Sequence, residues 1–89
     1  MLGYEKGQIV KSMAGRDKGQ FFIVMDIEED YLLLVDGKNR RIENPKKKKM
    51  KHIQITSQVV QEMADKLNTG DKVTNAEFRS CLKAFVEEN

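Results

Sequence analysis

Residues 7–24 of this chain read GQIVKSMAGRDKGQFFIV, and this stretch decides which fold the rest of the sequence can complete. Ile9 and Val10 lie in a brief extended segment, and residues 21–27 form a second one that is rich in β-forming side chains. Between them, residues 15–19 begin and end with glycine, which readily adopts the positive φ angles of a tight turn. The stretch therefore predicts two strands joined by a turn.

The β pattern continues after this first pair of strands. Alternation places four apolar residues of the second strand on one face, namely Phe21, Ile23, Met25 and Ile27. Residues 31–35 are a further apolar strand, and Asp36-Gly37 follows as a hairpin signal because both residues tolerate positive φ. We expect the returning strand over residues 38–43, ended by Pro45, which lacks the N–H that a sheet needs.

A last extended segment completes the predicted sheet. Residues 52–55 alternate and are expected to close it. About five short strands in so few residues predict a mainly β fold, a small and strongly bent five-stranded barrel over residues 1–56. The residues expected to form its structural turns are Gly15, Gly19, Asp36 and Gly37.

Residues 57–89 change to helical periodicity. Thr56 and Ser57 are candidate caps for a first helix, and residues 68–70 predict its end. Its apolar residues recur at helical spacing: Val59, Val60, Met63, Ala64 and Leu67.

A second short helix follows the first. Thr74 and Glu77 fit a capping box, in which the hydroxyl and the carboxylate each bind the other residue's free backbone N–H. Its apolar stripe contains Phe78, Cys81, Leu82, Phe85 and Val86. Helices this short are marginal alone in water, so we expect the C-terminal helical pair to pack on the barrel or on a partner.

Composition excludes several classes of function. The chain has 89 residues, of which 39% are hydrophobic and 34% charged, which is typical of one small folded domain. One histidine and one cysteine provide no zinc-ligand cluster, so we expect no metal site, no cofactor and no enzymatic activity. We interpret His52 as a hydrogen-bonding strand residue and Cys81 as a small buried apolar one.

Membrane and secreted locations are also disfavoured. The longest apolar run is Phe21 to Met25, far short of the roughly 20 residues of a spanning helix. The first residues do not resemble a signal peptide. A lone cysteine cannot form an internal disulfide, which fits a reducing compartment, so we expect no membrane partner and a cytoplasmic location.

Charge is distributed unevenly along the chain. The formal net charge is only +2, yet residues 36–51 contain eight of the 16 lysines and arginines and only two carboxylates. The lysine run 46–51 is a solvated loop, a mimic of a nuclear-localisation signal or a patch that follows phosphates, and we favour the patch because Arg40 and Arg41 lie close in sequence. Lysines supply affinity for a phosphate backbone without reading sequence. Residues 52–89 have four basic and six acidic side chains, so we expect the helices not to contact RNA.

The turn at residues 15–19 has two interpretations. Arg16 and Lys18 lie beside exposed backbone amides, an arrangement that can hold a phosphate. The alternative is an ordinary hairpin with solvated charges.

Three collinear motifs favour the first interpretation. Residues 7–24, with their G-x-x-K-G turn, resemble the KOW motif of ribosomal proteins and transcription elongation factors. The segments DGKNRRI (36–42) and NPKKKKMKHI (44–53) resemble the KOW branch in large-subunit ribosomal proteins of archaea and eukaryotes. Residues 74–79 look similar to the endings of short bacterial KOW-domain proteins. The resemblance implies an SH3-like barrel that binds RNA, often ribosomal RNA.

We therefore predict an RNA-binding protein of the ribosome or associated with it, which contacts ribosomal or other structured RNA through phosphates. Ribosomal proteins or a translation factor are further expected partners. The residues expected to contact RNA are Lys11, Arg16, Lys18, Lys38, Arg40, Arg41, Lys46, Lys47, Lys48, Lys49, Lys51 and His52. Phe21, Phe22 and Tyr31 are able to stack on bases, but such strand aromatics more often belong to the core. The alternative is a protein-interaction module that binds a translation or transcription factor.

Overall fold

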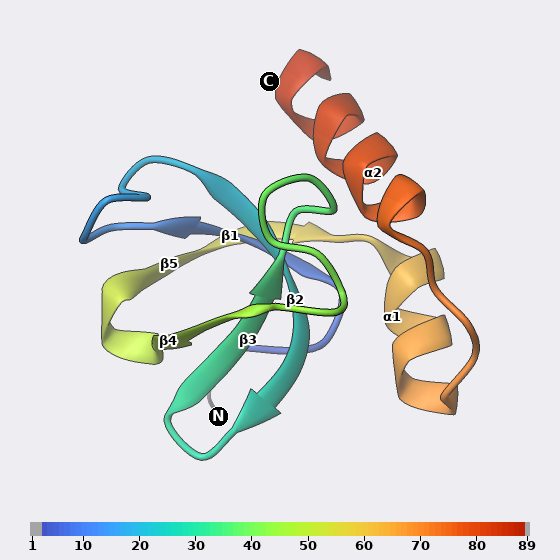
Figure 1. Cartoon of the computed structure of the whole chain (residues 1–89), viewed down its shortest axis with the longest axis horizontal. Coiled ribbons are helices and arrows are strands. Elements are labelled where there is room, and N and C mark those ends of the chain that lie inside the picture. The colour runs from blue at the N-terminus through green and yellow to red at the C-terminus, as the bar shows by residue number, and fades with distance from the viewer. Residues whose placement is uncertain (1–2, 89) are drawn as a thin grey trace.

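The structure is a computed structural model that describes residues 3–88. Its elements, in chain order, are β1 (Gln8–Ser12), β2 (Phe21–Glu28), β3 (Tyr31–Val35), β4 (Lys46–Lys49), the 3₁₀ helix η1 (Met50–His52), β5 (Ile53–Val59), α1 (Gln61–Thr69) and α2 (Asn75–Glu88). The predicted mainly β chain, with five strands followed by two α-helices, is confirmed in these residues (Figure 1).

The five strands form one antiparallel sheet in the order β4-β3-β2-β1-β5. Strand β1 is paired on both sides, with Val10 opposite Phe22 of β2 and opposite Ile55 of β5. Strands β4 and β5 are the two edges, so backbone hydrogen bonds leave the sheet open. Figure 1 shows the sheet strongly twisted, with α1 and α2 together on one side of it.

The prediction of a returning strand over residues 38–43 is wrong. The structure describes all of these residues, and they form turns and bends. One carboxylate oxygen of Asp36 accepts hydrogen bonds of 2.8–3.0 Å from three successive backbone N–H groups, those of Lys38, Asn39 and Arg40. These bonds wind the chain locally and occupy donors that a sheet would need. The lysine run forms the strand instead, with Lys46 opposite Leu34.

The last strand is longer than predicted. It runs to Val59, so Thr56 and Ser57 lie inside β5 and do not cap α1. The hydroxyl of Thr56 donates to the carbonyl of Ile9 at 2.7 Å, which attaches this part of β5 to β1. Helix α1 begins at Gln61 without a side-chain cap.

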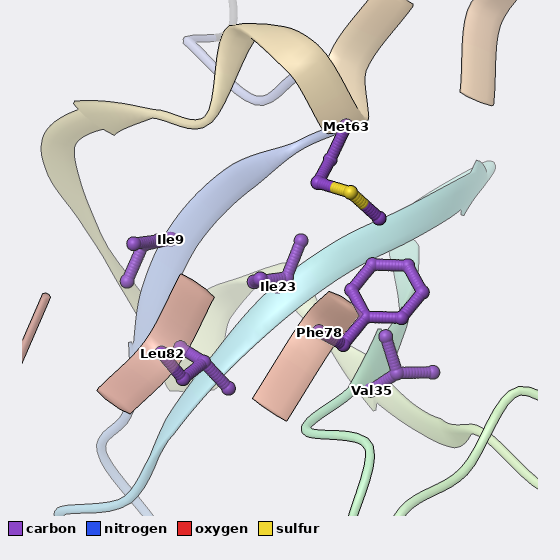
Figure 2. Packing of buried hydrophobic residues seen from close by; sticks show 6 residues of the cluster. All are labelled: Ile9, Ile23, Val35, Met63, Phe78 and Leu82. Atoms are coloured by element: carbon purple, nitrogen blue, oxygen red, sulfur yellow. The ribbon is translucent and has the colours of Figure 1, made fainter. Parts of the chain in front are cut away.

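Alternation along the strands gives the sheet an apolar cluster on each face. One cluster contains Val10, Phe22, Val24, Leu32, Leu34 and Ile53. The other joins strand residues Ile9, Ile23 and Val35 to Met63 of α1 and to Phe78 and Leu82 of α2 (Figure 2). Met63 and Phe78 are fully buried there. The apolar sides of both helices therefore pack on the sheet, one of the two outcomes that the sequence allowed.

A β-bulge divides the residues that were predicted to share one face of β2 between the two faces of the sheet. Phe21, Ile23 and Met25 share the helix-facing cluster as predicted, but Ile27 packs with the opposite one. The register shifts between Val24 and Asp26, which inserts one extra residue into β2. An inserted residue reverses the alternation beyond it, so Ile27 changes face.

The predicted end of the first helix and the predicted start of the second agree with the structure. Gly70 ends α1 in the left-handed conformation, with a φ of 80°. The N–H of Thr74 donates to the Glu77 carboxylate at 2.8 Å, and the N–H of Glu77 donates to the Thr74 hydroxyl at 3.2 Å, as a capping box requires. Across residues 3–88, neither helix is long and apolar enough to cross a membrane.

Candidate nucleic-acid interface

The turn between β1 and β2 is held by the side chain of Asp17. One carboxylate oxygen accepts a hydrogen bond from the Ser12 hydroxyl at 2.7 Å and another from the ammonium of Lys48 at 3.0 Å. The other oxygen lies 3.8 Å from the Lys46 ammonium. Gly15 and Gly19 flank the turn with φ angles of 86° and 92°, as predicted for turn glycines. The turn is therefore attached to β4, far along the chain.

The protein environment keeps Asp17 ionised. Burial by itself would raise the pKa of this carboxyl group. The hydrogen bond from Ser12, and the hydrogen bond and charge of Lys48, act in the opposite direction and hold the pKa below its usual value. The bridge to β4 is therefore charged at neutral pH.

The lysines of β4 fall into two pairs, because successive side chains of a strand point to opposite faces. Lys46 and Lys48 face Asp17. Lys47 and Lys49 lie over the ring of Tyr31, with ammonium-to-centroid distances of 4.9 and 5.7 Å. The run is thus neither a loop nor one uniformly solvated patch.

Lys48 is the lysine whose position differs most from the prediction. Its side chain is only 11% exposed, and besides Asp17 it donates to the carbonyl of Ala14 at 2.7 Å. By contrast, the side chain of Lys47 is 55% exposed. The structure gives Lys48 a role in holding the turn, which the sequence does not predict.

Three basic side chains from three separate segments converge on one cavity of about 240 Å³. Arg16 comes from the β1–β2 turn, Arg40 from the β3–β4 loop and Lys46 from β4. The remaining lining residues are Asp17, Gln20, Phe22 and Asn39. We call this hollow the basic cavity. With three cations against one carboxylate that already has partners, it is suited to an anionic group.

The basic cavity has a defined backbone around it. The N–H of Arg40 donates to Asp36 at 2.8 Å, and its carbonyl accepts from the N–H groups of Asp36 and Gly37. Arg40 is therefore fixed by its own loop, while Lys46 is fixed by the pairing of β4 with β3. The backbone that positions each of these two cations at the cavity is therefore held by hydrogen bonds or strand pairing.

The other predicted contact residues lie outside this cavity. Lys18, Lys38, Arg41 and Lys51 are exposed, and His52 is half-buried. Lys11 on β1 lies over the ring of Phe21, with its ammonium 5.7 Å from the centroid. The structure thus brings three of the predicted residues together at this cavity, and the others do not line it.

Sequence reasoning missed two polar residues of the cavity, Gln20 and Asn39. Neither is charged, so a search for basic residues does not find them. Their only signal is position, because Gln20 follows the turn glycine Gly19 and Asn39 precedes Arg40.

Within residues 3–88, no group of three or more histidine, cysteine, aspartate or glutamate side chains is placed to hold a metal ion. Cys81 is half-buried on α2, and burial together with the nearby carboxylates of Glu62 and Glu77 raises the pKa of its thiol.

Comparison with protein-family models found no match, and comparison with curated proteins found none either.

Proposed function

We propose that this protein binds RNA through the phosphate backbone, as a ribosomal or ribosome-associated protein in the cytoplasm. The observation that carries the proposal is the convergence of Arg16, Arg40 and Lys46 on the basic cavity. Guanidinium groups bind phosphate oxygens with paired N–H donors, and a lysine adds a compact positive charge. The exposed cations nearby, such as Lys18, extend this surface.

The resemblance to KOW sequences supports the same proposal. We propose that the bent sheet is an SH3-like barrel of the KOW type, in which side-chain hydrogen bonds tie β4 and η1 to other parts of the chain. Lys48 donates to the carbonyl of Ala14, which joins the edge strand β4 to the connection between β1 and β2. The hydroxyl of Tyr4 donates to the carbonyl of Met50 at 3.0 Å, which joins the N-terminal segment to η1.

Salt dependence is the first test. If about four to six phosphates are neutralised, the logarithm of the binding constant should fall with the logarithm of salt concentration at a slope of roughly −3 to −5. Fluorescence anisotropy with a labelled fragment of ribosomal RNA measures this slope. An apolar protein contact depends little on salt, so a flat response or no RNA binding would contradict the proposal and favour a protein-interaction module.

Arg16→Ala tests the basic cavity directly. Loss of one phosphate contact should weaken binding to all RNA sequences and make the salt slope less negative by about 1. Stability should change little, because Arg16 is exposed. The matched control is Lys72→Ala, which removes an exposed cation from the connection between α1 and α2. Equal effects of the two substitutions would show that only net charge matters, and the cavity would not be the site.

A further inference from the structure

A second hollow lies between α2 and the loops of the sheet, with a volume of about 540 Å³. Phe21 of β2 and Leu82 and Val86 of α2 supply its apolar lining. Val86 is 55% exposed, more than any other large apolar residue described. We call this hollow the α2 groove. Its volume lies within the range of roughly 300–1,000 Å³ that small-molecule sites occupy.

The loop between β3 and β4 fixes one side of the α2 groove. Figure 1 shows this loop, in green, beside α2. The side-chain oxygen of Asn75, the first residue of α2, accepts from the N–H of Ile42 at 2.8 Å. Arg79 donates to the carbonyl of Gly37 at 2.6 Å. The groove is therefore formed by parts of the protein that are bonded to each other.

The α2 groove and the basic cavity are adjacent, because Gln20 lines both. Phe21 and Phe22, the first two residues of β2, follow Gln20, and their side chains face in opposite directions. Phe21 therefore lines the groove, and Phe22 lines the basic cavity. A ligand with an anionic part and an apolar part therefore has a place for each on the two sides of Gln20.

The charges around the α2 groove favour an anionic chain. Lys38, Arg79 and Lys83 line it, against two carboxylates. One of these belongs to Asp36, and its Oδ1 already accepts three backbone hydrogen bonds. Lys38 and Lys83 are exposed.

We propose that the α2 groove holds an unpaired nucleobase of an RNA strand whose phosphate lies in the basic cavity. This inference rests on the proposed RNA binding and specifies its substrate as single-stranded or looped RNA. Bases of an A-form duplex are stacked inside it, whereas an unpaired base is free to enter an apolar, aromatic site. The acidic residues of the helical segment do not oppose this: Glu62 and Asp65 lie on α1 outside the groove, and Glu87 of α2, which lines it, is outnumbered there by Arg79 and Lys83 of the same helix.

Val86→Glu tests the inference. The substitution places a carboxylate in the groove at an exposed position, so the fold should be retained, as circular dichroism would verify. The control is Ser80→Glu, which makes the same change of charge at an exposed position of α2 outside the groove. The probes are an oligouridylate of ten nucleotides and an RNA duplex with the same number of phosphates.

We expect Val86→Glu to weaken oligouridylate binding roughly tenfold, as loss of a base-stacking site does, and duplex binding no more than Ser80→Glu does. Equal losses for the two variants, or for the two probes, would overturn the inference and leave RNA binding through phosphates intact. An unchanged affinity of Val86→Glu would do the same and leave the groove to a different partner, such as an acidic peptide. Failure of the unsubstituted protein to bind either RNA would instead refute the proposed function itself.

Discussion

The two turns that line the basic cavity are each organised by an aspartate, but in different ways. Asp36 accepts hydrogen bonds from backbone N–H groups no more than four residues away. Asp17 binds side chains, and two of them, Lys46 and Lys48, come from a strand about thirty residues further along the chain. The turn at Asp36 is therefore a local structure, whereas the turn at Asp17 depends on the correct placement of β4.

Gly37→Val should be the most damaging of these substitutions. Gly37 has a φ of 76°, and a Cβ atom there would collide with the carbonyl oxygen of Asn75. Backbone strain and overpacking together should lower the free energy of unfolding by roughly 3–5 kcal/mol in urea titrations.

Gly19→Val is the matched control for Gly37→Val. Gly19 also has a positive φ, but nothing lies within 4 Å of the Cβ position. Only the backbone strain is introduced, so we expect a loss of about 1–3 kcal/mol. Equal losses at the two glycines would show that the β3–β4 loop does not pack against α2 as described.

Lys48→Met should cost about 2 kcal/mol of stability, because it removes a partner of a half-buried carboxylate and leaves Asp17 with Ser12 and Lys46. Lys47→Met, on the same strand, removes an exposed cation and should cost no more than about 0.5 kcal/mol. Thermal denaturation of both variants measures the difference. A loss of stability in Lys48→Met as small as that in Lys47→Met would mean that the turn holds its shape without β4.

Replacing all four lysines of β4 together would combine this loss of stability with any loss of RNA binding. The four lysines are therefore better replaced one at a time.

Acid should weaken the turn at Asp17, by less than Lys48→Met does. The pKa of Asp17 is lower in the folded protein than its ordinary value of 3.8. Its contribution to stability is therefore complete above pH 3.8 and is lost as the pH falls through the lower folded value. The stability difference between the parent protein and Asp17→Asn should accordingly be largest near neutral pH and narrow in acid. Urea titrations between pH 2 and 7 measure it, and a constant difference would contradict the ionic role of Asp17.

Features that depend on neighbours within a few residues could be predicted from the sequence. The capping box of Thr74 and Glu77 and the helix stop at Gly70 are of this kind. So is the positive φ of Gly19. In each case the hydrogen bonds or steric limits that decide the conformation lie in adjacent residues, so a short pattern carries the whole cause.

The errors share the opposite property. The local bonds of Asp36 keep residues 38–43 out of the sheet, but that the lysine run pairs with β3 in their place was decided by a non-local pairing, that of Lys46 with Leu34. The face of Ile27 depends on a bulge in the pairing of β2 with β3, and alternation along one strand contains no information about such an insertion.

The sequence by itself determined that this chain is mainly β with two helices, and that half of its basic side chains lie between residues 36 and 51. Only the tertiary structure decided which of those side chains are available and which are used internally. Lys46 and Lys48 both lie beside Asp17, but Lys48 is hydrogen-bonded to it and nearly buried, whereas Lys46 also lines the cavity that Arg16 and Arg40 line. The reason is that charge is a property of each residue, while convergence depends on strand register, which brings distant residues within bonding distance only after the sheet has formed.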